Sequence, residues 1–143
     1  MELYLSSLVR RVHHEIRRRL LDELRARGYH DITQAHLYVF QRPGPDGCRP
    51  TELAQRTIVT KQAMNHLLAG LESGGYLRRL PDPHDGRGTV VRLTPKGRKL
   101  TNLVHRTASA IEHEWAEQLG PARMDELLVL LHEVDEIARV PAV

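Results

Sequence analysis

The stretch PTELAQRTIVTKQAMNHLLAGLESGGYLRR, residues 50–79, decides the fold of this chain. Pro50 suits the first turn of a helix over residues 51–56, although an arginine stands before it where a capping Ser, Thr or Asp would be expected. A short way further on, Thr60 can cap a second helix, and the pair Gly74-Gly75 ends that helix. Two helices joined by so short a turn form the pattern of a helix-turn-helix.

The second of these helices has one apolar and one polar face. Its apolar residues recur at spacings of three and four and are Met64, Leu67, Leu68 and Leu71. The polar side chains left facing outward near its start are Lys61, Gln62, Asn65 and His66. Amides can bond an adenine through two hydrogen bonds in the major groove, and lysine can reach guanine or phosphate. This face therefore has the side chains needed to recognise DNA bases. The alternative interpretation is an ordinary solvent-exposed helix surface without a DNA-binding role.

A hairpin follows the two helices. Short strand-like runs at residues 76–80 and 89–93 flank the polar segment PDPHDGRG, residues 81–88, which predicts a β-hairpin with a long polar tip. Arg87 lies between two glycines at this tip, where its guanidinium can extend into a narrow, electronegative minor groove. A plain solvated turn is the alternative reading of the same residues.

Two aspartates in the tip would repel a polyanion unless they are paired. We expect Asp82 and Asp85 to pair with Arg87, or with Arg78 and Arg79 on the first strand. Such pairs would orient the arginines while the excess positive charge meets phosphate.

Helical patterns lie on both sides of this region. An amphipathic stripe runs from the start of the chain to Gly28, and Thr33 can cap a short helix after it. Thr94-Pro95 begins a long helix, Gly120-Pro121 breaks it, and a last helix follows over about residues 122–138. The predicted fold is mainly α with a small β-hairpin wing, in the order α-α-α-α-β-β-α-α.

Composition limits the classes of protein that this chain can be. At 143 residues it is long enough for one compact domain with its own core. Cys48 is the only cysteine, which excludes an intramolecular disulfide and a cysteine-based zinc site within one subunit. No stretch is apolar enough for a membrane span or a cleaved leader, so we expect a cytoplasmic protein with no membrane partner. Residues 49–92 hold seven basic against four acidic side chains, which fits an anionic partner as well as a solvated surface.

Catalytic and metal-binding patterns are missing from the sequence. It contains no HExxH, no phosphate-binding glycine loop and no GxSxG, so we expect neither enzyme activity nor a cofactor. His105 and His113 lie about 12 Å apart along one helix axis, too far apart to hold one metal ion together. Cys48 is interpreted as a small buried apolar residue rather than a redox sensor. We therefore expect no metal site.

Residues 50–79, followed by DPHDGRGTVVRLTPKGRKL at 82–100, resemble the MarR family, the multiple-antibiotic-resistance type of winged-helix regulators. The likeness covers nearly the whole chain. It implies a single domain over residues 1–143, with a winged helix-turn-helix at 32–94 and dimerisation helices at 1–28 and 95–139. It also implies a homodimer whose two winged domains bind the halves of a pseudo-palindromic operator in double-stranded DNA.

The chain departs from the family in two places. The family's wing commonly carries two adjacent arginines after the second aspartate, whereas here Gly86 precedes the single Arg87. Peroxide-sensing members use a cysteine in the first helix, and this chain has none there. The family resemblance further implies a small-molecule cavity, for which Arg17, His36 and Phe40 are candidate neighbours.

These inferences make the chain a sequence-specific DNA-binding regulator, with a repressor released by a small aromatic effector as the leading hypothesis. A constitutive regulator or activator without an effector is the alternative, and a winged-helix protein-interaction module that has lost DNA binding is a third reading. The candidate DNA contacts are Thr60, Lys61, Gln62, Asn65, His66, Arg78 and Arg87.

Overall fold

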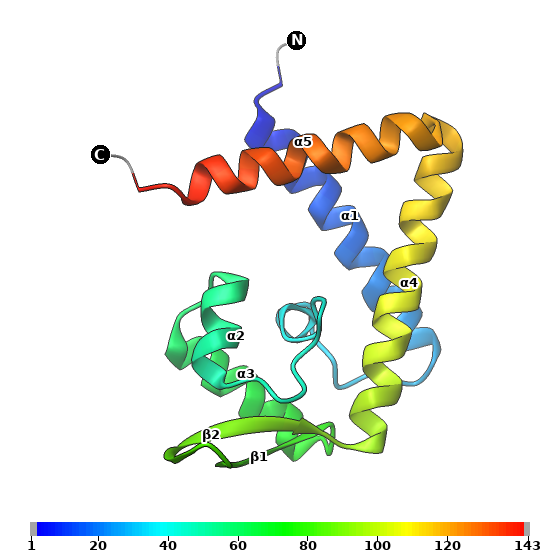
Figure 1. Ribbon diagram of the computed structural model, residues 1–143. Coiled ribbons are helices and arrows are strands. Elements are labelled where there is room, and N and C mark those ends of the chain that lie inside the picture. Colours follow the sequence, from blue (N-terminus) through cyan, green and yellow to red (C-terminus); the bar gives the residue numbers. More distant parts are fainter. Residues whose placement is uncertain (1–2, 142–143) are drawn as a thin grey trace. The chain divides into compact units, whose positions relative to one another are not determined.

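The computed structural model describes residues 3–141 (Figure 1). Over these residues the chain forms five α-helices, one 3₁₀ helix and one two-stranded antiparallel sheet. The elements are α1 (Leu5–Ala26), η1 (Ala35–Tyr38), α2 (Pro50–Thr57), α3 (Lys61–Ser73), β1 (Leu77–Asp82), β2 (Asp85–Leu93), α4 (Pro95–Leu119) and α5 (Pro121–Arg139). The predicted fold class is confirmed, with a single turn of 3₁₀ helix in place of the second predicted helix.

The chain divides into two compact units inside α4, between Ala108 and Ser109. The first unit contains α1 to β2 and the first half of α4. The second unit contains the rest of α4 and α5. No helix of residues 3–141 combines the length and the apolar character that crossing a membrane requires.

The first unit has a core to which every one of its elements from α1 to α4 contributes. The predicted apolar face of α3 is buried, which confirms the periodicity argument. Removing such side chains from water is the main favourable term in folding. The side chains with no exposed surface are Leu24, Val39, Phe40, Leu53, Met64, Leu68, Leu71, Val91 and Leu100.

Helix η1 is shorter than the sequence pattern predicts. Leu37, Val39 and Phe40 are all buried, and their spacing of two and one cannot place them on one face of an α-helix. The chain therefore makes one 3₁₀ turn and bends. The N-cap residue is Gln34 rather than the predicted Thr33, but Thr33 is bonded to the turn, because its Oγ1 accepts the His36 backbone N–H at 3.4 Å and its own N–H donates to His36 Nδ1 at 3.0 Å.

The prediction of a long polar hairpin tip is wrong. The strands continue to Asp82 and Asp85, which pair with each other across an irregularity in the register. The Asp82 carboxylate accepts the His84 N–H at 2.9 Å, and the Asp85 carboxylate accepts the Arg87 N–H at 3.1 Å. Side chains that bond the backbone two residues later make tight turns, so the tip needs fewer residues than the polar segment suggests.

Cys48 lies beside the hairpin and is half-buried rather than fully buried as predicted. Its carbonyl accepts the Val91 N–H at 2.8 Å, and the Gly47 N–H donates to the Val91 carbonyl at 2.7 Å. The loop before α2 therefore runs along β2 as a short third strand-like segment.

The first turn of α4 is fastened to the start of the hairpin. Thr94 caps the helix as predicted, since its Oγ1 accepts the Gly97 N–H at 3.1 Å, and its hydroxyl donates to the Gly75 carbonyl at 2.6 Å. A Cβ atom at Gly97 would overlap the carbonyl oxygen of Tyr76. Only glycine allows so close an approach between the helix and the backbone.

Replacing Gly97 with alanine should destabilise the fold by about 2–3 kcal/mol, because the added methyl group must push α4 away from Tyr76. In an unconstrained helix the same exchange is stabilising. Urea denaturation of Gly97→Ala measures the loss. Gly86→Ala is the matched control, since its Cβ meets open space, and it should change stability by less than about 0.5 kcal/mol. Equal midpoints for the two variants would contradict this close approach.

Candidate nucleic-acid interface

The polar face of α3 is exposed where the sequence predicted it. Met64, Leu67 and Leu68 pack into the core, and the opposite face of the helix is therefore exposed to solvent. Thr60 caps the helix by accepting the Ala63 N–H at 3.0 Å, which leaves its hydroxyl proton free to donate elsewhere. The exposed polar residues at this end of the helix are Thr60, Lys61, Gln62, Asn65 and His66.

Helix η1 packs against α3 at Gly70. The ring of His36 lies 3.2 Å from the position that a Cβ atom of Gly70 would occupy, so the two elements pack closely there. Burial lowers the pKa of His36 below its usual value, and nearby His66 lowers it further, against the opposing charge of Asp31. His36 thus contributes to the position of α3 through packing as a mainly neutral ring.

The hairpin carries exposed arginines on one of its faces. Arg78 and Arg92 are direct partners in the strand register, and both are exposed. Like charges directly opposite each other across two strands destabilise a hairpin, which favours an anionic partner at this face. Arg92 was missed by the sequence analysis, because its pairing with Arg78 depends on the register. Arg87 lies exposed beside the tip, as predicted.

The other hairpin arginine holds the hairpin against α3. Arg79 pairs with Glu72 at 3.1 Å, and the Arg79 backbone N–H donates to the same carboxylate at 2.8 Å. These two donors keep the pKa of Glu72 below its ordinary value. The hairpin base is therefore tied to the helix that carries the polar face.

The predicted partners of the two tip aspartates are wrong. Asp82 pairs with Arg49 at 2.6 Å, and the carboxylate is almost fully buried. Asp85 bonds the backbone of Arg87 rather than its guanidinium. The unusual arginine before Pro50 was the available signal, since Arg49 makes no capping bond and its side chain reaches the hairpin instead.

Comparisons with known proteins agree with this geometry. The family model described as MarR family matches residues 30–88. The multiple antibiotic resistance protein MarR of Salmonella typhimurium strain LT2 is 31% identical over 106 residues, covering 73% of this chain and 74% of that protein. The chain belongs to the MarR family.

Solved structures share the MarR fold over almost all of their length. The transcriptional repressor CouR, bound to a 23-mer DNA duplex, aligns with a TM-score of 0.72 at 22% identity, covering 94% of this chain and 99% of that one. The MarR-family protein Rv2887 of Mycobacterium tuberculosis, in complex with salicylic acid, aligns with a TM-score of 0.66 at 25% identity, covering 93% and 97%. Relatives named as transcriptional regulators place this chain in that class of protein.

The three candidate pocket residues of this MarR-family chain are each engaged with neighbours. Arg17 is buried and stacks over the ring of Tyr38, with its guanidinium carbon 4.0 Å from the ring centre. His36 bonds Thr33 as described above. Phe40 is fully buried, and its carbonyl oxygen lies 2.7 Å from His105 Nε2. Their role at an effector site stays a prediction.

Asp82→Asn should remove a pH-dependent part of the stability. The His84 N–H and Arg49 lower the pKa of Asp82 below 3.8, so the folded state favours the carboxylate. A lowered pKa contributes stability above the unfolded value and loses it as the pH falls through the folded value. The stability gap between wild type and Asp82→Asn should thus be largest near neutral pH and shrink below about pH 4.

Urea denaturation at a series of pH values measures this gap. Asp125→Asn, on the exposed surface of α5, is the control, and at neutral pH it should change the stability by less than about 0.5 kcal/mol. A gap for Asp82→Asn that is constant down to strongly acidic pH would contradict the assigned ion pair.

Proposed function

We propose that this MarR-family chain is a transcriptional repressor that binds a pseudo-palindromic operator as a homodimer and is released by a small-molecule effector. The observation that carries the proposal is the exposed polar face of α3 next to a hairpin with exposed arginines. In CouR, which has the same fold, the repressor is bound to a DNA duplex. In the present chain, α3 and the hairpin supply the side chains that such binding needs.

Helix α3 has the chemistry of a major-groove reader. The major groove is about 12 Å wide and admits one α-helix. Gln62 and Asn65 can each present an amide to an adenine, while Lys61 stands at the helix start, where the helix dipole also favours a phosphate. The polar face, from Thr60 to His66, therefore combines base reading with backbone binding.

The hairpin has the chemistry of a wing that follows the DNA backbone. Arg78 and Arg92 face each other across the strands, and a nearby phosphate would offset the repulsion between their charges. Arg87 can extend from the tip into the minor groove. Because Arg79 and Asp82 hold the hairpin to α3 and α2, the arginines keep a defined place relative to the reading helix. One wing arginine replaces the two that are common in the family.

Two substitutions should separate base reading from backbone attraction. The operator is first found by selection from random duplex DNA, where an inverted repeat is expected. Asn65→Ala should cost about 1–3 kcal/mol on this operator and relax the preference at one position per half-site. Arg87→Ala should weaken binding to all duplexes and make the salt dependence shallower by about one unit for each phosphate that it ceases to neutralise.

Fluorescence titrations on matched and scrambled duplexes at several salt concentrations measure both effects. Ser73→Ala, at the far end of α3, and Arg25→Ala, on α1, are matched controls that should bind as wild type does. Unchanged base preference for Asn65→Ala together with unchanged affinity for Arg87→Ala would place the DNA surface elsewhere.

The homodimer is supported by apolar surface that remains exposed in each unit. In α5 five exposed apolar side chains follow one another from Leu127 to Leu131, which is unusual for a surface that stays in water. In α1 exposed apolar residues also follow the first turns. These residues are Leu5, Leu8, Val9 and Val12 in α1, and Leu127, Leu128, Val129, Leu130, Leu131, Val134 and Ile137 in α5. On this ground we infer that α1 and α5, within the segments 1–28 and 95–139, supply the apolar contacts of the dimer.

A charge in the apolar face of α5 should break the dimer. Leu128 is 47% exposed in the single chain, so Leu128→Asp should leave the fold intact but place a carboxylate in the interface. Sedimentation velocity should find monomer. Leu80→Asp is the matched control, since Leu80 is 42% exposed on the hairpin, and it should stay dimeric. A dimer that tolerates Leu128→Asp would contradict this interface.

Release by an effector is supported by Rv2887, which was solved with salicylic acid. A small aromatic acid that binds the off-DNA arrangement of the dimer more tightly would lower operator affinity without dissociating the subunits. Operator titrations with and without salicylate test this step. An unchanged affinity with a broad set of small acids would favour the constitutive regulator instead.

A further inference from the structure

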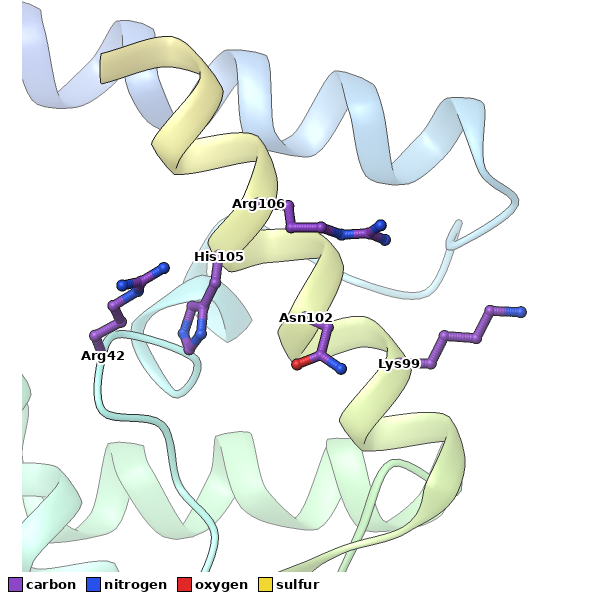
Figure 2. A pocket seen from close by; sticks show the side chains of 5 residues that line it. All are labelled: Arg42, Lys99, Asn102, His105 and Arg106. Atoms are coloured by element: carbon purple, nitrogen blue, oxygen red, sulfur yellow. The ribbon is translucent and has the colours of Figure 1, made fainter. Parts of the chain in front are cut away.

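A cavity of about 490 Å³ opens in the first unit between α4 and the loop after η1. Figure 2 shows Arg42 beside His105, with Lys99 and Arg106 extending from the same helix as Asn102. Three of the lining side chains carry a permanent positive charge, and none is acidic or aliphatic. The lining residues are Arg42, Lys99, Asn102, His105 and Arg106.

Two of these cations lack an ion-pair partner among the residues that the structure describes. Within residues 3–141, no carboxylate forms an ion pair with Lys99 or Arg106. They lie two turns apart on α4, on either side of Asn102. Like charges gathered around a concavity repel each other, and an anion in the cavity would offset this repulsion.

His105 adds a directed group to the cavity wall. Its Nε2 lies 2.7 Å from the carbonyl oxygen of Phe40, and because a carbonyl only accepts, Nε2 carries a hydrogen.

We propose that this cavity binds a small oxyanion with two or more negative charges, such as a phosphorylated metabolite. Several cations around one cavity can form more charged hydrogen bonds with a polyvalent anion than with a single carboxylate. The wall also lacks the apolar side chains that usually hold an aromatic ring. The ligand class is therefore different from the aromatic acid of the effector hypothesis.

The loop that forms one wall of the cavity is bonded to α2 and to the hairpin. Arg56 of α2 donates to the Gly44 carbonyl at 2.8 Å, and the Asp46 carboxylate accepts the Leu93 N–H of β2 at 2.8 Å. An anion that draws Arg42 towards α4 would therefore act on α2 and on the hairpin through this loop. This effect on operator binding rests on the proposed function, whereas anion binding itself does not.

Calorimetric titration of the intact protein with inorganic pyrophosphate near neutral pH, at constant ionic strength and without DNA, tests the site. Salicylate is the aromatic monovalent comparison. Wild type should bind pyrophosphate more tightly than salicylate. Lys99→Gln and Arg106→Gln should each weaken pyrophosphate binding by about tenfold, because each removes one charged hydrogen bond. Arg25→Gln, an exposed arginine on α1, is the control and should bind as wild type does.

The site is refuted if pyrophosphate does not bind, if salicylate binds more tightly, or if the two cavity variants bind pyrophosphate as wild type does. Both substituted side chains are exposed, and thermal unfolding checks that the variants stay folded. Because these titrations contain no DNA, a failure of the proposed function would leave their result intact.

Operator titrations test the coupling separately. Pyrophosphate should change the operator affinity of wild type but not of the double variant Lys99→Gln/Arg106→Gln. An unchanged wild-type affinity would overturn the coupling through the loop. If the double variant loses operator affinity without any added anion and its salt dependence becomes shallower, the cavity binds DNA phosphate, and the small-anion proposal is wrong.

Discussion

The contacts around Tyr76 fix the arrangement on which the proposed DNA-facing surface depends. Its side chain is buried, and its hydroxyl donates to Asp31 at 2.6 Å. Burial, together with Asp31, raises the pKa of this phenol, so the hydroxyl stays a donor. The Tyr76 carbonyl accepts the Thr94 N–H at 3.1 Å and leaves room only for a glycine at position 97. The end of α3, the start of the hairpin and the start of α4 meet at this one residue.

This junction matters for the proposed function, because α3 and the hairpin must keep one spacing in order to contact one DNA duplex. Two charged pairs extend the junction outward. Arg79–Glu72 joins the hairpin base to α3, and Arg49–Asp82 joins the far end of the hairpin to α2. With both pairs in place, the hairpin that carries the exposed arginines would need little rearrangement on the proposed binding of DNA, which would preserve affinity. The cavity beside α4 is linked to the same elements through the loop that holds Gly44 and Asp46.

The parts of the fold that local signals encode were predictable from the sequence. Thr60 and Thr94 act as caps because a hydroxyl followed by free backbone N–H groups bonds them in almost any context. The apolar face of α3 follows from spacing alone, and so do the polar residues opposite it. The same reasoning placed Arg78 and Arg87 on a hairpin, since Gly-rich polar segments between strand-like runs favour turns.

Contacts between residues far apart in the sequence were decided only by the tertiary structure. Asp82 has Arg87 as a near neighbour in sequence, yet its partner is Arg49, because the fold brings the start of α2 against the hairpin. The pattern around Leu37 suggested a helix, but burial of three closely spaced side chains required a 3₁₀ turn. The cationic cavity joins Arg42 to two turns of α4, a set that no spacing rule relates. Caps and faces depend on neighbours along the chain, whereas ion pairs and cavities depend on which surfaces the core brings together.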